Sequence, residues 1–152
     1  MQIKNVFDPQ EVEVLINRIE RLNPEKQPIW GKMNVAQMLA HVNISYEMVY
    51  ENTHKRPPFL MRFLLKTFVK PMIINTKPMK KNGPTSPALI RAGEEDFQVQ
   101  KERLITYLLR TQQAGPSYFE GRESLSFGRL RAEEWNILFY KHLNHHLTQF
   151  GV

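Results

Sequence analysis

The stretch Ala132–Gln149, AEEWNILFYKHLNHHLTQ, indicates the fold class most directly. Its apolar residues recur three and four positions apart, which is the spacing of the buried face of an α-helix. Gly151 follows as a suitable helix stop. His142 and His146 lie four positions apart near its end, so on a helix they stack about 6 Å apart on the face that should be buried.

Three further stretches have the same helical period. The first is predicted to open at Asp8, which suits the N-cap position, with Pro9 as the first helical residue and Glu11 completing a capping box. Asn23 and Pro24 should end it, because the residue before a proline avoids helical geometry.

The second helix is predicted to begin after Gly31, with Asn34 and Gln37 as a cap pair, and to stop near Glu51 to His54. The third should run from about residue 93 to residue 113.

The end of the third helix is set by Gly115 and Pro116, and 116–130 should be a loop. The buried side of this helix and the anchors of the loop are predicted to be Phe97, Leu104, Ile105, Leu108, Leu109, Phe119, Phe127 and Leu130.

Four amphipathic helices without any alternating strand pattern predict an all-α fold, a four-helix bundle. The length of 152 residues fits a single domain, 1–152, with its own hydrophobic core. An extra basic helical segment is expected between the second and third helices, over Phe59 to Ile74, with Pro71 interrupting it. A turn-rich loop, KPMKKNGPTSP, follows from Lys77.

Charge is concentrated in that segment. Residues 55–91 contain no acidic residue, although the whole chain has a net charge of only +6. The nine basic residues are Lys55, Arg56, Arg62, Lys66, Lys70, Lys77, Lys80, Lys81 and Arg91. The structural interpretation is that the basic residues form a solvated face, while the apolar residues on the other side of the segment cap the bundle. The functional interpretation is attraction of an acidic small molecule, a membrane surface or nucleic acid.

The chain has no cysteine, which excludes disulfides, iron–sulfur clusters and thiolate metal sites. The N-terminus lacks the apolar core of a signal peptide, and no run of 18 apolar residues exists. A cytoplasmic protein is expected.

The histidines form the candidate site. His142 and His146 could hold a metal ion together with His41 from the second helix, because facing helices of a bundle are a regular place for such sites. The bland alternative is a set of hydrogen-bonded core histidines. His145 is one step off the inward face and should be a surface residue or support a ligand, and His54 should be exposed.

The surroundings of the site are predicted in less detail. Gln37, Ser45 and Gln149 could orient the histidines. No carboxylate falls on the same face, so a general base is missing and no catalytic residue is assigned. The candidate pocket walls are Trp30, Tyr46, Trp135 and Phe139, although for any one of them the role of a core aromatic residue is favoured.

Two motifs resemble the DinB/YfiT-like superfamily of metalloenzymes, in an uncharacterised domain-of-unknown-function branch. The first is WGKMNVAQMLAH, from Trp30 to His41, and the second runs from Phe127 through HLNHHLTQFG, which ends at Gly151. The loop from Lys77 is also similar to that branch. Arg131 departs from the pattern, because Ser or Thr would be the usual cap there.

The resemblance implies an up-down-down-up bundle with a divalent metal on His41, His142 and His146. Nickel or zinc is the metal implied first, with iron or manganese as alternatives. It also implies a homodimer, a small-molecule substrate and, in some relatives, a low-molecular-weight thiol as cofactor.

The leading hypothesis is therefore a metal-dependent enzyme, similar to thiol S-transferases, that activates a water or a thiol for transfer to, or hydrolysis of, a small electrophile. Lys77, Lys80 and Lys81 would bind the anionic cofactor. The alternative is a non-catalytic module that docks nucleic acid or a membrane through residues 55–91. No stable partner of either kind is expected, although the basic segment leaves both open.

Overall fold

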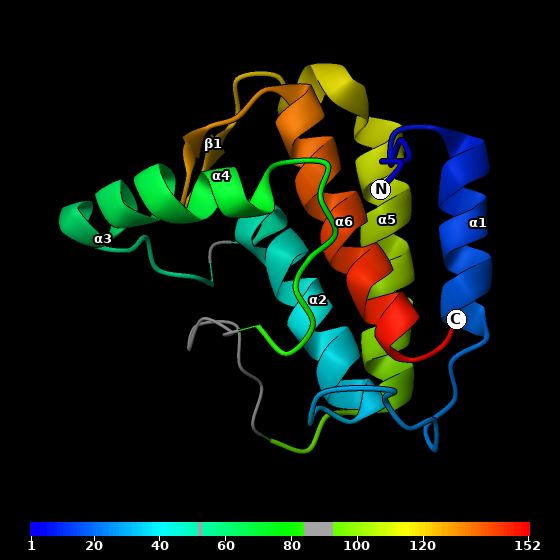
Figure 1. Ribbon diagram of the computed structural model, residues 1–152. Coiled ribbons are helices and arrows are strands. Elements are labelled where there is room, and N and C mark those ends of the chain that lie inside the picture. Colours follow the sequence, from blue (N-terminus) through cyan, green and yellow to red (C-terminus); the bar gives the residue numbers. More distant parts are fainter. Residues whose placement is uncertain (52, 84–92) are drawn as a thin grey trace.

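The computed structural model describes residues 1–51, 53–83 and 93–152 (Figure 1). These residues are mostly helical, as predicted for an all-α fold. The helical elements are α1 (Pro9–Glu20), α2 (Val35–Tyr50), α3 (Phe59–Leu64), the π-helical turn η1 (Leu65–Val69), α4 (Lys70–Ile73), α5 (Phe97–Phe119) and α6 (Ala132–Gln149). None of the described helices is long and apolar enough to cross a membrane.

Four long helices lie side by side in Figure 1, with α2 and α5 running in one direction and α1 and α6 in the other. Helix α5 packs against α1, α2 and α6, and α2 also packs against α6. The core between them contains fully buried residues from all four helices, among them Ile19, Leu39, Leu104, Leu108 and Phe139. Burial of each such side chain contributes about 1.5–3 kcal/mol, so these contacts hold the helices together.

The helix starts follow the predicted caps in part. Asp8 caps α1 by accepting from the Gln10 amide, and Asn34 and Gln37 form the predicted capping box of α2. The predicted box of α1 is wrong, because the Glu11 carboxylate pairs with Lys4 at 2.9 Å.

Helix α6 begins without a Ser or Thr cap. The Glu134 carboxylate accepts from the Arg131 amide at 2.9 Å, and the Glu120 carboxylate accepts from the Ala132 amide at 2.8 Å. Two carboxylates thus accept hydrogen bonds from amides at the start of α6, where a Ser or Thr hydroxyl would be the usual cap. Their negative charges also interact favourably with the positive end of the helix dipole.

Helix α5 continues beyond its predicted end. Gly115 has a positive φ of 70° and breaks the helix, as predicted, but one more turn follows and places Phe119 in the core. The prediction that Leu109 is buried is wrong. Leu109 is 41% exposed, because the inward face passes through Leu108 and Tyr107, and Leu109 lies about 100° further around the helix.

The predicted loop after α5 also contains a small antiparallel ribbon, β1 (Glu123–Ser124) and β2 (Gly128–Arg129). Each strand has only two residues, too few for an alternating pattern to be recognised in the sequence. Phe127 and Leu130 are buried, as predicted for anchors of this segment.

The segment between α2 and α5 is a continuous helical rod from Phe59 to Ile73. The prediction that Pro71 interrupts it is wrong. Pro71 is the second residue of α4, which follows the wider π-helical turn η1, and the first turn of a helix tolerates a residue without an amide donor. Residues 74–83, which we call the strap, then cross in front of α6 and α2 in Figure 1. Arg91 and the end of the predicted basic loop, from residue 84, lie outside the described residues.

Candidate metal centre

The fold brings His41 of α2 together with His142 and His146 of α6. The three ring centroids are 4.7 to 4.9 Å apart. Each residue offers a ring nitrogen, and these nitrogens all lie within 4.8 Å of one another. It is the one group of three or more potential metal ligands in the described part of the chain.

The protonation state of the histidines suits metal binding. Burial, followed by repulsion from the neighbouring imidazoles, holds the pKa of His142 well below its usual range. Burial likewise lowers the pKa of His146 to about 3. Both rings are therefore neutral near pH 7 and can present a lone pair to a cation.

The spacing of the nitrogens also fits an ion. The Nε2 atoms of His41 and His142 are 2.9 Å apart. In a tetrahedral zinc site, with metal–nitrogen bonds of about 2.0–2.1 Å, ligand nitrogens lie about 3.3 Å apart. A small outward adjustment would place the two nitrogens around one cation, and the donor set is an all-imidazole one that nickel, zinc and iron accept.

The orientation of the His146 ring is set by Gln149, which contacts its Nδ1 atom. Its Nδ1 lies 2.7 Å from Gln149 Oε1, while Gln149 Nε2 donates to the Trp30 carbonyl at 2.6 Å. The amide oxygen therefore faces His146, and Nδ1–H must be the donor. That tautomer leaves the Nε2 lone pair of His146 available to a cation, and the contact of Gln149 with His146 is as predicted.

Gly31 provides the space for this contact. It has a positive φ of 87°, and a Cβ atom there would lie 2.5 Å from Gln149 Nε2. A glycine is needed both for the backbone conformation and for the close approach of the Gln149 amide.

The other predicted supporting residues have different tasks. Gln37 is part of the capping box of α2, and the Ser45 hydroxyl donates to the Val42 carbonyl at 2.7 Å. His145 lies outside the group of three, as predicted, with its ring 5.1 Å from that of His146 and 5.7 Å from that of Trp30.

Among the four candidate wall aromatics, Trp30 has a described ring contact with a histidine. Tyr46, Phe139 and Trp135 form a stack in the core, with ring centroids 4.6 and 5.5 Å apart, which supports their interpretation as core residues. Trp30 packs near His145, and the Lys81 ammonium stands 4.2 Å above its ring.

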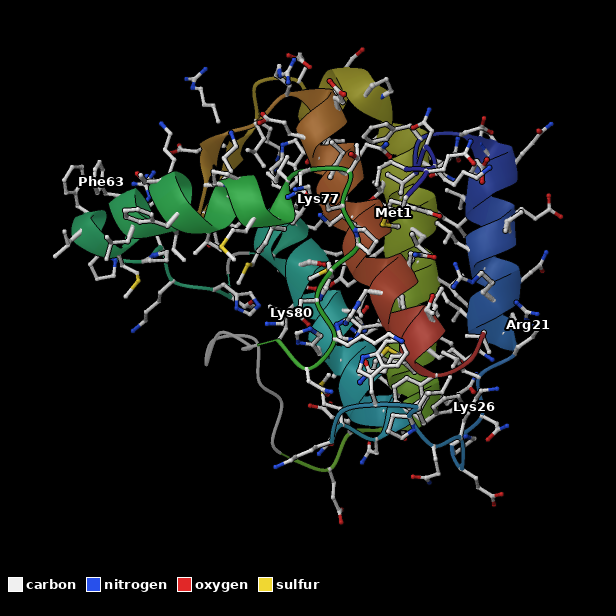
Figure 2. All side chains as sticks on the ribbon, viewed as in Figure 1. Met1, Arg21, Lys26, Phe63, Lys77 and Lys80 are labelled. Atoms are coloured by element: carbon white, nitrogen blue, oxygen red, sulfur yellow. The ribbon has the colours of Figure 1, made fainter. Side chains whose placement is uncertain are left out.

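The predicted cofactor-binding lysines all belong to the strap, and Figure 2 labels Lys77 and Lys80. Lys77, Lys80 and Lys81 are exposed, and Lys81 alone of the three has a described contact with an aromatic ring near the histidines. The strap is fastened to α6 by Lys141, which sequence reasoning missed. Its ammonium donates to the backbone and side-chain oxygens of Asn75, both at 2.9 Å.

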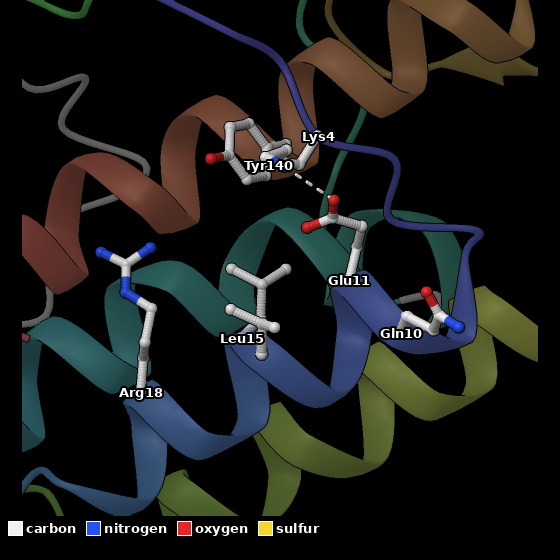
Figure 3. A pocket seen from close by; sticks show the side chains of 7 residues that line it. Lys4, Gln10, Glu11, Leu15, Arg18 and Tyr140 are labelled. Atoms are coloured by element: carbon white, nitrogen blue, oxygen red, sulfur yellow. Dashed lines mark hydrogen bonds and ion pairs between the residues drawn. The ribbon is translucent and has the colours of Figure 1, made fainter.

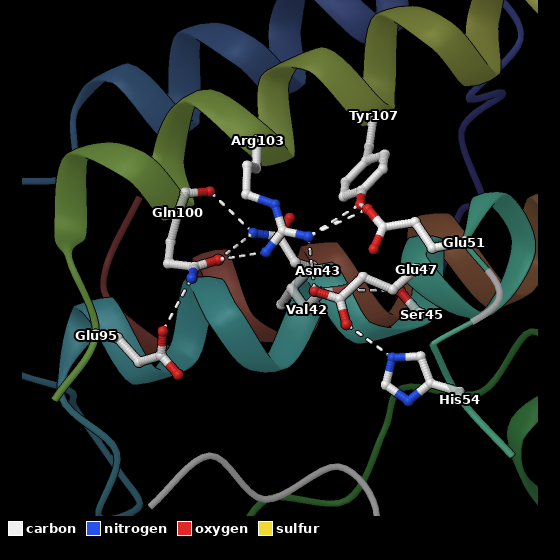
Figure 4. Close-up of polar contacts among 10 residues, drawn as sticks. All are labelled: Val42, Asn43, Ser45, Glu47, Glu51, His54, Glu95, Gln100, Arg103 and Tyr107. Atoms are coloured by element: carbon white, nitrogen blue, oxygen red, sulfur yellow. Dashed lines mark hydrogen bonds and ion pairs between the residues drawn. The ribbon is translucent and has the colours of Figure 1, made fainter. Parts of the chain in front are cut away.

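A buried polar network between α2 and α5 was also missed (Figure 4). Glu47 is only 3% exposed, and its carboxylate contacts Arg103 at 3.0 Å and His54 at 2.7 Å. The prediction that His54 is exposed is therefore wrong. The i, i+4 spacing of Glu47 and Glu51 was the available signal, because it puts both carboxylates on one side of α2.

A cavity of about 320 Å³ lies between α1 and α6, on another side of the protein (Figure 3). Its two cations are already engaged, Lys4 with Glu11 and Arg18 with Asn144. The three histidines do not line this cavity, so it adds nothing to the metal centre.

Comparison with known proteins identifies a family but no named relative. No curated protein and no solved structure matches the chain. The model of one family, described as a protein of unknown function (DUF1569), matches residues 4–151. Because this match spans nearly the whole chain, the protein belongs to the DUF1569 family.

Proposed function

We propose that His41, His142 and His146 hold a divalent metal ion and that this centre serves an enzyme. The observation that carries the proposal is the triangle of three imidazoles, 4.7 to 4.9 Å between centroids, with two nitrogens facing each other at 2.9 Å. Without a cation, one of these two ring nitrogens would have to donate to the other. Nickel or zinc fits the donor set first, and iron or manganese second.

We further propose that the domain is a DinB/YfiT-like four-helix bundle with up-down-down-up topology. The opposite directions of the α1/α6 and α2/α5 pairs support this assignment, as does the origin of the three ligands from the second and last long helices.

The proposed reaction is transfer of a thiol to a small electrophile, or hydrolysis of that electrophile. The metal would lower the pKa of a bound water or thiol and so make it a nucleophile near neutral pH. Gln149 keeps the Nε2 lone pair of His146 directed inward. We propose that Lys81 beside Trp30, with Lys77 and Lys80 of the strap, binds the carboxylates of a low-molecular-weight thiol.

Metal analysis of the purified protein tests the centre. The parent protein and His145→Ala should retain a divalent metal through dialysis, whereas His142→Ala should lose it, because it removes one of three ligands. Equal metal content in His142→Ala and the parent would refute the assignment of the ligands.

The proposed chemistry needs a separate readout. In the cobalt-substituted protein, a low-molecular-weight thiol should shift the visible absorption bands, and Lys81→Gln should weaken the response. If metal is bound but no thiol or electrophile changes the spectrum, the centre stands and the transferase function fails.

A further inference from the structure

The helical rod formed by α3, η1 and α4 carries a large apolar surface. Phe59 is 83% exposed, Met72 74% and Leu60 68%. Four more large apolar residues of the rod are exposed: Met61, Phe63, Leu64 and Phe68. Taking about 200 Å² for each side chain, the rod exposes roughly 900 Å² of apolar surface. Monomeric proteins usually expose no patch above about 300–600 Å², so a partner should cover this one.

The opposite side of the rod fixes its orientation. Arg62 pairs with Glu123 at 2.9 Å, and Lys70 pairs with Glu134 at 2.8 Å. Leu65, Val69 and Ile73 pack against the core. Of the three basic residues spaced by four along the rod, Arg62 and Lys70 thus attach the rod to the rest of the protein. The apolar face is left pointing outward, and the rod projects beyond the long helices in Figure 1.

The ionisable side chains of the rod itself are all basic, although Glu123 and Glu134 of the neighbouring elements pair with Arg62 and Lys70. The sequence has no acidic residue between Glu51 and Glu94. Lys66 is exposed on the rod itself, and Lys55 is exposed just before it. An apolar helix face with lysines at its edge attracts a surface that is both apolar and negatively charged.

We propose that the rod docks on an anionic lipid surface. Phe59, Phe63 and Phe68 would enter the boundary between headgroups and acyl chains, and Lys55 and Lys66 would contact lipid phosphates. A second copy is a poorer partner, because two rods would bring their lysines together and neither rod carries a carboxylate of its own to pair with them. The proposal concerns peripheral binding and is independent of the metal centre.

Flotation with lipid vesicles tests the proposal. The parent protein should float with phosphatidylcholine vesicles that contain phosphatidylglycerol, and much less with phosphatidylcholine alone. Lys55→Gln with Lys66→Gln should weaken binding roughly 25-fold, since each lysine near an anionic surface contributes about fivefold. Phe59→Ser with Phe63→Ser and Phe68→Ser should weaken it at least tenfold.

A matched control replaces exposed apolar residues elsewhere. Val14, Ile29 and Val99 are 55%, 68% and 50% exposed, and their substitution by Ser should leave vesicle binding unchanged. Circular dichroism should report the same helix content for all variants. Equal flotation of the triple Phe variant and the parent would overturn the proposal. The proposal would also fail if the parent did not float and instead formed dimers that dissociate in the triple Phe variant. It would fail as well if the protein bound a DNA oligonucleotide and the triple Phe variant bound it equally well.

Discussion

At the scale of single residues, the contact between Gly31 and Gln149 joins the start of α2 to the candidate ligand His146. The Gln149 amide bridges the Trp30 carbonyl and His146 Nδ1, and the Gln149 carbonyl accepts from the Ile29 amide at 2.8 Å. The turn before α2 therefore sets the orientation of a ring on α6. Such supporting contacts commonly change metal affinity by about 10- to 100-fold.

Gly31→Ala tests this link. The substitution should cost about 1–2 kcal/mol for the positive φ alone. The additional clash with Gln149 Nε2 should displace the amide and weaken metal binding, measured by competition with a chromophoric chelator.

Gly121→Ala is the matched control. Gly121 also has a positive φ, 71°, but a Cβ atom there would have no neighbour within 4 Å. The control should lose stability in urea without losing metal affinity. Equal metal affinity in the two variants would show that Gln149 does not orient His146.

At the scale of elements, the polar network between α2 and α5 predicts a pH dependence. A hydrogen bond from Tyr107, together with nearby Arg103, lowers the pKa of Glu51. Burial, and then the same hydrogen bond, raises the pKa of Tyr107 from 10.0 to about 12. The native network therefore needs an ionised Glu51 and a neutral Tyr107.

The sign of each effect follows from linkage. The Glu51 contribution to the free energy of unfolding should be present above its unfolded pKa, near 4.5, and lost as the pH falls through the lower folded value. The Tyr107 contribution should be present below pH 10 and lost as the pH rises towards 12. Urea unfolding across pH should show both losses in the parent.

Glu51→Gln should reduce the acid loss, and Tyr107→Phe should reduce the alkaline one, to which the other buried tyrosines, with raised pKa values, also contribute. Parallel pH profiles for the parent and both variants would contradict the assigned roles. Glu133→Gln is a suitable control, because Glu133 is exposed and its described contact, with Arg131, is long at 3.8 Å.

At the scale of the whole molecule, the strap is held by two amino groups. Lys141 is only 1% exposed, and its ammonium reaches the two oxygens of Asn75. The N-terminal amino group of Met1 donates to the Thr76 carbonyl at 2.9 Å. Burial lowers the pKa of Lys141, so this contact is made at a desolvation cost.

Lys141→Met should release the strap while leaving the helices intact. The apolar side chain restores the packing and relieves the desolvation cost, so stability in urea should change little. Hydrogen exchange of residues 75–81 should become faster, because these amides lose their attachment to α6. Unchanged exchange there would show that the strap is held by other contacts. Lys26→Met, on another loop, is the control.

How far the sequence predicts the molecule depends on whether the interaction is local. The spacing of His142 and His146, the capping box of Asn34 and the break at Gly115 depend on neighbours within a helical turn, and all three appear as predicted. The predictions for His54, Leu109 and Pro71 are wrong for three different reasons. His54 folds back onto Glu47 beyond the end of α2, the exposure of Leu109 depends on the rotation of α5, and Pro71 follows a π-helical turn that no local pattern records.

The sequence alone determined which residues could carry chemistry. Helical period placed two histidines on one face, and the absence of cysteine limited a metal site to nitrogen and oxygen donors. Tertiary packing decided the rest. It brought His41 within 2.9 Å of His142 across 101 positions, set Gln149 behind His146 and left the apolar side of the rod uncovered. The physical reason is that period and capping act within a few residues, whereas the meeting of two helix faces depends on the packing of the entire core.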